Sequence, residues 1–138
     1  MITNIIQFRV RYAETDQMSY VYHGNYAQYL EMGRIEWLRK LGVSYKKMEE
    51  TGIMLPVINL NINYLKSAKY DDLLTVKTTL VKRPSAKIEF IYEIKNESGE
   101  ILTTATTTLV FIHMQTNKPT RAPEYLLKII DENTVKLP

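Results

Sequence analysis

The sequence predicts an α+β fold in which an antiparallel sheet of about five strands covers one long α-helix. Three observations carry this prediction: a period-two strand near the N-terminus, one amphipathic helix after it, and a succession of alternating strands from residue 58 onward. A sheet that covers one helix leaves its other face and its edge strands exposed. The pattern therefore also predicts that the chain forms dimers.

The first strand is expected over residues 5–12, where apolar side chains alternate with Gln7, Arg9 and Arg11. Residues 13–23 show no regular period and are rich in polar side chains, so we expect an ordered loop. Asp16 lies in this loop, shortly before the period changes to that of a helix.

The long helix is expected to begin at Tyr26, because large apolar residues then recur at helical spacing as far as residue 41. Asn25 is a candidate N-cap that Gln28 can complete as a capping box. Gly42, which follows Arg39 and Lys40, is expected to end the helix. Gly33 costs about 1 kcal/mol relative to alanine inside a helix. We interpret it as a point where the sheet passes too close for a side chain.

The remainder of the chain is expected to be mostly strands. Residues 44–51 predict a short second helix, and residues 123–131 a terminal one. Between them, strands are expected at 58–64, 74–80, 88–95 and 101–113. Because the connections are short, consecutive strands are predicted to pair antiparallel.

Composition limits the possible classes. A chain of 138 residues, 45% hydrophobic and 24% charged, suits one core, so a single domain over 1–138 is expected. The net charge is only +3, which gives no support for nucleic-acid or membrane binding. The chain has no cysteine, which excludes disulfides, a thiol nucleophile and thiolate metal sites. It also has no apolar run long enough to cross a bilayer, and a cytoplasmic location is expected.

The acid and the helix start predict an active site. Asp16 can supply a carboxylate, and the first N–H groups of the helix lack partners within the helix. The alternative is a structural acid that forms an Asx-turn or pairs with Arg9 or Arg11. The residues alone favour that alternative.

The surrounding motif reverses this balance. The segment RYAETDQMSYVYHGNYAQYLEMGRIEWLRKLG resembles the opening of hotdog-fold acyl-CoA thioesterases of the 4-hydroxybenzoyl-CoA thioesterase type, particularly the Tol-Pal-associated subgroup. The resemblance continues through residues 64–74 and 118–123. Ser19, Gly24 and Ser67 depart from it, because the family usually has glycine, alanine or proline, and proline at these positions. The resemblance implies a hotdog fold and a homodimer or homotetramer with the active site at the subunit interface. No cofactor or metal is expected.

The resemblance also implies roles for individual residues. Asp16 either attacks the thioester or activates water, and the sequence does not choose between these routes. A backbone N–H near His23 donates to the oxyanion, and the His23 side chain orients the loop or the substrate. The predicted substrate-binding residues are Tyr22, Gly24, Asn25, Tyr26 and Glu31, together with Arg83 and Lys87 for the phosphates of CoA. Each of these residues also has a purely structural interpretation. The tyrosines can be core aromatics and Asn25 a helix cap, Glu31 can form a surface pair with Arg34, and the basic side chains can be solvated charges.

Other functions receive less support. A non-catalytic acyl-CoA binder, an acyl-carrier-protein thioesterase or a hydratase of the same fold stay open as alternatives. A small nucleic-acid-binding domain is disfavoured, because the basic residues are interleaved with acids. His23 and His113 lack the spacing of a zinc site, and HExxH, CxxC and GxSxG motifs are absent from the sequence.

Overall fold

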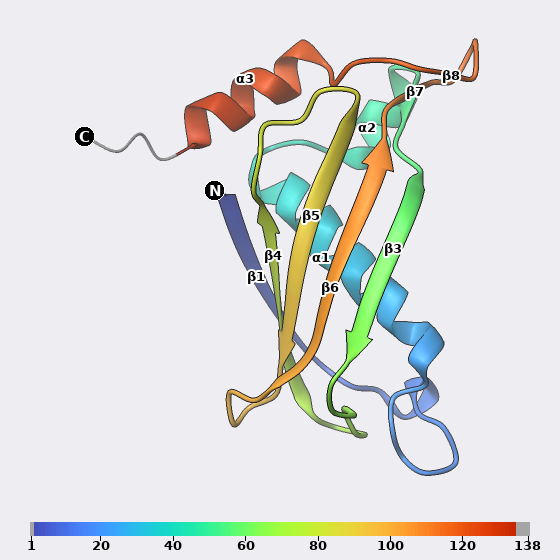
Figure 1. The fold of residues 1–138 in the computed structure, drawn as a ribbon, viewed down its shortest axis with the longest axis vertical. Coiled ribbons are helices and arrows are strands. Elements are labelled where there is room, and N and C mark those ends of the chain that lie inside the picture. Colours follow the sequence, from blue (N-terminus) through green and yellow to red (C-terminus); the bar gives the residue numbers. More distant parts are fainter. Residues whose placement is uncertain (1, 135–138) are drawn as a thin grey trace.

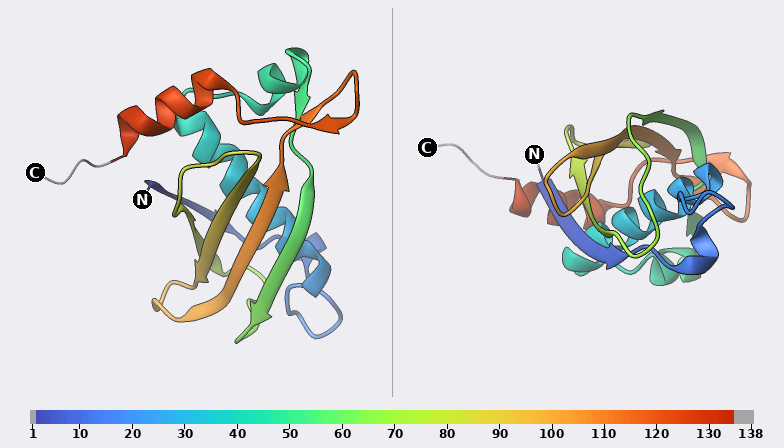
Figure 2. Two further views of the ribbon diagram at one scale, coloured as in Figure 1. Left: turned by 45° about the horizontal axis from the view of Figure 1, so that its top comes forward. Right: turned by 90° about the horizontal axis from the view of Figure 1, so that it is seen from below.

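A five-stranded antiparallel sheet curves around the long helix α1 in the computed structural model, which describes residues 2–134 (Figure 1). Seen from below, the sheet wraps around the helix (Figure 2). The predicted α+β hotdog architecture is therefore confirmed. The sheet has the order β1-β4-β5-β6-β3, formed by β1 (Ile2–Arg9), β4 (Leu73–Leu80), β5 (Lys87–Lys95), β6 (Ile101–Val110) and β3 (Val57–Tyr64) around α1 (Tyr26–Lys40).

Smaller elements complete one end of the molecule. A minor sheet has the order β2-β7-β8, and α2 contacts β2. A third helix, α3, lies at the same end of the molecule (Figure 1). No helix within residues 2–134 is both long and apolar enough to span a bilayer. Residues 1 and 135–138, which the single-domain prediction includes, lie outside the described residues. The smaller elements at this end are β2 (Ile53–Met54), β7 (Ile112–His113), β8 (Lys118–Pro119), α2 (Tyr45–Glu50) and α3 (Glu124–Asn133). Two 3-10 helices, at Tyr12–Glu14 and His23–Asn25, precede α1 in the chain.

The helix lies very close to the sheet at Gly33. A Cβ built on Gly33 would lie 2.5 Å from Thr78 Oγ1 and 3.2 Å from Val76 Cγ1, both on β4. The predicted close approach is therefore confirmed. The end of α1 also agrees with the sequence, because Gly42 adopts a φ of +84° just beyond it.

The helix start differs from the prediction. Asn25 is helical in its own backbone and makes no side-chain cap, because the 3-10 turn of residues 23–25 leads straight into α1. Its side-chain Nδ2 instead donates to the carbonyl oxygen of Glu14 at 2.9 Å. The predicted capping box with Gln28 is therefore wrong.

Two strand predictions are also corrected. The first strand ends at Arg9 rather than at residue 12, and Tyr12 opens a 3-10 turn with 78% of its surface exposed. The last predicted strand is two strands, β6 and β7, separated by Phe111. The backbone N–H of Phe111 turns away to donate to the carbonyl of Ala86 at 3.1 Å.

The strand pairing agrees with the sequence only in part. β4 with β5 and β5 with β6 form the predicted antiparallel neighbours. β3, however, pairs with β6 and not with β4, while β1 occupies the free side of β4. β3 is therefore an edge strand, and its apolar residues Val57, Ile58, Leu60 and Tyr64 are between 41% and 52% exposed.

Candidate active site

Asp16 lies in a short hairpin beside the start of α1, at the end of the molecule opposite α3 (Figure 1). Thr15 and Val21 form a β-bridge, and Asp16 N donates to Tyr20 O at 2.8 Å. Ser19 closes the hairpin with a φ of +66°. This left-handed conformation favours glycine, which explains why glycine suits position 19. Serine adopts it only at a cost in backbone strain.

One oxygen of the Asp16 carboxylate is hydrogen-bonded within its own turn. Oδ1 accepts the backbone N–H groups of Met18 at 2.9 Å and Tyr20 at 3.2 Å, so the Asx-turn of the structural alternative is present. Oδ2 has no hydrogen bond within residues 2–134, and the residue is exposed. One oxygen therefore holds the carboxylate in place and the other is free to meet water or a substrate carbon.

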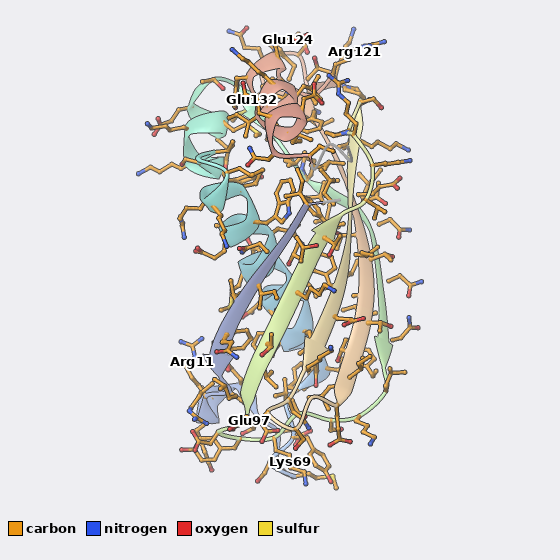
Figure 3. All side chains as sticks on the ribbon, turned by 90° about the vertical axis from the view of Figure 1, so that its left-hand side faces the viewer. Arg11, Lys69, Glu97, Arg121, Glu124 and Glu132 are labelled. Carbon is orange, nitrogen blue, oxygen red and sulfur yellow. The ribbon has the colours of Figure 1, made fainter. Side chains whose placement is uncertain are left out.

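Neither candidate arginine pairs with Asp16. Arg9 donates to Asp71 O at 2.9 Å and lies 3.5 Å from Glu97 Oε1, and Arg11 pairs with Glu14 at 2.8 Å. Of the two structural roles considered for Asp16, the structure therefore shows the Asx-turn but not an ion pair with Arg9 or Arg11. Arg11 and Glu97 mark this end of the molecule in Figure 3.

The turn that precedes α1 supplies backbone donors. Within the part of the chain that the structure describes, no acceptor is found for the N–H groups of His23 or Gly24. These groups stand at the positive end of the α1 dipole, where a developing negative charge is favoured. The hairpin and this turn are neighbours in the chain and are joined by the bond from Tyr22 N to Glu14 O at 2.9 Å. The arrangement can offer a carboxylate and anion-binding donors to one ligand.

Aromatic rings surround the turn. The ring of Tyr22 packs against that of His23, tilted by 40°, with centroids 4.5 Å apart. A Cβ on Gly24 would lie only 2.7 Å from Cε2 of Tyr22, so glycine at this position is what lets the Tyr22 ring lie across the turn. Tyr64 from β3 donates its hydroxyl to the carbonyl of His23 at 3.3 Å. The side chains of Tyr22, His23 and Tyr64 are all exposed.

Tyr26 and Glu31 occupy different settings on α1. Tyr26 is 2% exposed and accepts the backbone N–H of Ala68 at 3.3 Å, and burial raises the pKa of its hydroxyl. Glu31 is exposed and borders a cavity of about 180 Å³ between α1, α2 and the sheet. Arg34, its expected surface partner, donates instead to the hydroxyl of Tyr92 at 3.4 Å.

The structure does not bring Arg83 and Lys87 to Asp16 within one chain. Both follow β4 at the end of the sheet where α3 lies, away from the hairpin of Asp16 (Figure 1). Arg83 forms a bidentate pair with Asp131 of α3, with N–O distances of 2.9 and 3.2 Å. Lys87 is exposed at the start of β5. Their contact with a substrate stays a prediction.

Glu14 is a residue whose importance the sequence did not reveal. It is an acid with only 8% of its surface exposed, and it contacts the hairpin, Arg11 and α1. The only local signal is an arginine three residues before it, which a surface pair would also produce. Among the described residues, no group of three or more His, Asp or Glu side chains is placed to hold a metal.

Comparisons with known proteins identify relatives over nearly the whole length. Residues 10–130 match the Thioesterase-like superfamily. YneP of Bacillus subtilis (strain 168) is 37% identical over 113 residues, 82% of each chain. The acyl-CoA thioesterase YbgC of Haemophilus influenzae is 32% identical over 127 residues, 90% of this chain and 93% of that one. The crystal structure of a DHNA-CoA thioesterase from Staphylococcus aureus superimposes with a TM-score of 0.90 at 42% identity, covering 96% of this chain and 91% of that one.

Proposed function

Because the chain belongs to the thioesterase-like superfamily, we propose that it hydrolyses acyl-CoA thioesters at the hairpin of Asp16 and the start of α1. The relatives named above support the activity. The site itself is inferred from one observation. Among the described residues, Oδ2 of Asp16 and the N–H groups of His23 and Gly24 in the neighbouring turn have no hydrogen-bond partner.

The chemistry follows from these two parts. The thioester carbonyl accepts hydrogen bonds from the N–H groups of His23 and Gly24, which stabilise the negative charge that develops on its oxygen. In one route Asp16 removes a proton from water, and that water attacks the carbonyl carbon. In the other route Asp16 attacks directly and forms a mixed anhydride that water then hydrolyses. In both, the C–S bond breaks, CoA leaves as a thiolate that takes up a proton, and the acyl group leaves as a carboxylate.

The side chains around the turn suit a substrate site. Tyr22 and the His23 ring form an exposed aromatic wall beside the donors, with Gly24 leaving room for the ring of Tyr22. Asn25 fixes the turn to Glu14, and buried Tyr26 anchors the first turn of α1. We assign His23 a role in orienting substrate through its ring, and the oxyanion role to its backbone.

The finer classification and the assembly are proposals too. The segment around Asp16 supports the 4-hydroxybenzoyl-CoA thioesterase type and its Tol-Pal-associated subgroup. The exposed apolar edge of β3 supports a homodimer or a larger assembly, with the site at the interface. Tyr64, which lies on that edge and bonds to His23, connects the two features. An interface there also allows phosphate-binding residues such as Arg83 and Lys87 to come from another subunit.

The proposal is tested by measuring thiol release from a panel of acyl-CoAs. The panel holds short, long and aromatic acyl groups and DHNA-CoA, the substrate class in the name of the Staphylococcus aureus relative. Asp16→Asn keeps the volume of the side chain and removes the charge. We expect a loss of at least about a hundredfold in kcat for every substrate that the wild type hydrolyses.

Asp71→Asn is the matched control. Asp71 is also exposed, and its φ of +66° is one that asparagine adopts as readily as aspartate. The control is expected to retain wild-type rates. Equal activity of wild type and Asp16→Asn would remove Asp16 from the mechanism. Binding of acyl-CoA with no hydrolysis of any thioester would contradict the activity itself.

A further inference from the structure

Glu14 is a buried carboxylate whose two oxygens are fully occupied by hydrogen bonds. Oε1 accepts the backbone N–H of Arg11 at 2.8 Å and the hydroxyl of Tyr29 at 3.0 Å. Oε2 accepts Nε of Arg11 at 3.1 Å and Nη2 at 2.8 Å. These four donors come from the chain before the hairpin and from the first turn of α1. The carboxylate therefore joins those two segments.

The backbone of Glu14 makes a second set of links. Its carbonyl oxygen accepts Tyr22 N, where the hairpin returns, and Asn25 Nδ2, from the 3-10 turn, both at 2.9 Å. His23 and Gly24 lie between these two donors, and Asp16 lies two residues after Glu14. Glu14 is thus bonded to residues before and after the hairpin of Asp16. It is also bonded to the residues on either side of His23 and Gly24.

We propose that Glu14 is a positioning residue that fixes Asp16 relative to the backbone donors of His23 and Gly24. This inference rests on the proposed function. Attack on a thioester needs the carboxylate and the oxyanion donors to be held in one geometry before the substrate arrives. Asp16 is on an exposed hairpin and holds itself only through its own turn, so the orientation of the whole hairpin must come from outside it. The bonds of Glu14 tie the hairpin to the start of α1, in addition to the backbone bonds from Val21 N to Ala68 O and from Tyr70 N to Ser19 O.

The charge of Glu14 is part of this role. Burial opposes ionisation, but the hydrogen bonds from Arg11 and Tyr29 outweigh it and lower the pKa of the carboxyl below its ordinary value. An ionised carboxylate accepts at both oxygens. Glutamine has the same shape but only one acceptor, so its NH₂ group would face donors from either Arg11 or Tyr29 whichever way the amide is turned. Glu14→Gln should therefore loosen the hairpin without emptying its space.

The test compares Glu14→Gln with wild type for an acyl-CoA that the wild type hydrolyses. We expect kcat to fall between about tenfold and a hundredfold while KM changes less than about threefold, because orientation of the reacting groups is lost and substrate contacts are kept. The matched control is Glu36→Gln, which also breaks an acid–arginine pair at a spacing of three residues, with Arg39 on the exposed side of α1. This control is expected to keep the wild-type kcat.

A double-mutant cycle separates positioning from general damage. In an Asp16→Asn background, Glu14→Gln should cost less than about threefold in the residual rate, since the group that it positions is already gone. An equal loss in both backgrounds would show that Glu14 only supports the fold and would overturn the inference. An unchanged kcat in the single variant, with Asp16→Asn still inactive, would overturn it and leave the proposed function intact.

A milder variant covers the case in which Glu14→Gln does not fold. Tyr29→Phe removes one donor to Glu14 and keeps the ring contact with Phe8, whose centroid lies 4.7 Å away. We expect a fall of at least about threefold in kcat with KM retained. Wild-type kcat in this variant would contradict the inference.

Discussion

Gly33 gives the most direct test of the packing at the scale of a single residue. Gly33→Ala places a Cβ 2.5 Å from Thr78 Oγ1, on a strand in the interior of the sheet. Overpacking of this kind costs about 1–3 kcal/mol, against a gain of about 1 kcal/mol from the helix propensity of alanine. We expect a net loss in the free energy of unfolding, measured by denaturant titration.

A second substitution checks the cause. Thr78→Ala removes the hydroxyl that the new Cβ would meet, so the double variant Gly33→Ala with Thr78→Ala should be more stable than the sum of the two single changes predicts. Simple additivity of the two changes would mean that the clash is not the reason for the loss.

Single residues of the site were predictable to different degrees. Asp16 could be singled out as a candidate because the sequence around it forms a specific motif, and its role stays a prediction. The close approach at Gly33 could be predicted because a glycine inside a helix is unfavourable without such a reason. Glu14 could not, because its burial depends on Tyr29, fifteen residues away, and on the hairpin folding back over it. Asn25 was predicted as a cap, yet the carbonyl of Glu14 takes its side chain. A tertiary hydrogen bond therefore overrides the local capping propensity of Asn25.

Among the elements, the strand pairs joined by short turns were predictable and the pairing of β3 was not. The chain between β3 and β4 does not turn back directly. It runs beside the hairpin of Asp16, where Val21 N donates to Ala68 O at 2.9 Å and Tyr70 N to Ser19 O at 3.1 Å. Alternation fixes which face of a strand is apolar but leaves its neighbour open. This detour separates β3 from β4 along the chain, and it also contacts the hairpin of the proposed active site.

The link between the β4–β5 connection and α3 provides a prediction for Arg83. Arg83→Met breaks the bidentate pair with Asp131. Both side chains of this pair are exposed, so the pair should contribute little to stability. If Arg83 binds the phosphates of CoA in the assembly, KM for acyl-CoA should rise at least about threefold. KM for an acyl thioester of N-acetylcysteamine, which has no phosphate, should not change.

The control for this prediction is Asp131→Asn, which weakens the same pair and keeps the arginine. A rise in KM for both thioesters, or an equal rise in both variants, would assign Arg83 to the structure of α3 rather than to the substrate.

For the whole molecule, the charge of Glu14 predicts how stability changes with pH. Its pKa is lower in the folded chain than in the unfolded chain, whose glutamates titrate at about 4.3. Its contribution is therefore complete above that value and is lost as the pH falls through the lower, folded pKa. Arg11 and Tyr29, the groups that face it, stay protonated over this range. The difference in unfolding free energy between wild type and Glu14→Gln should shrink as the pH falls from about 6 to about 3.

Denaturant titrations at several pH values measure this difference, with Glu36→Gln, whose side chain is 41% exposed, as the control. The control should differ little from wild type across the range. A difference for Glu14→Gln that stays constant with pH would mean that its charge does not stabilise the fold.

The edge of the sheet predicts how the molecules assemble. Leu60 on β3 faces the helix side of the sheet, as its neighbour Thr107 does, yet it is 44% exposed because α1 packs over β1 and β4. A second chain laid against β3 would cover it. A lysine at such an edge opposes strand addition and apolar contact. Leu60→Lys should therefore shift the sedimentation mass from two or more chains toward one. Because Tyr64 on the same strand contacts His23, activity should fall in parallel with assembly.

Ile91 is the matched position, since it is also 44% exposed but lies on β5 in the interior of the sheet. Ile91→Lys adds the same charge to the same extent of exposed surface without touching the β3 edge, so it should keep the contact between chains at β3 and the activity. A Leu60→Lys variant that is monomeric and fully active would place the site within one chain. One that stays assembled would move the interface away from β3. Parallel loss in Leu60→Lys alone would tie the hairpin of Asp16 to the neighbouring subunit.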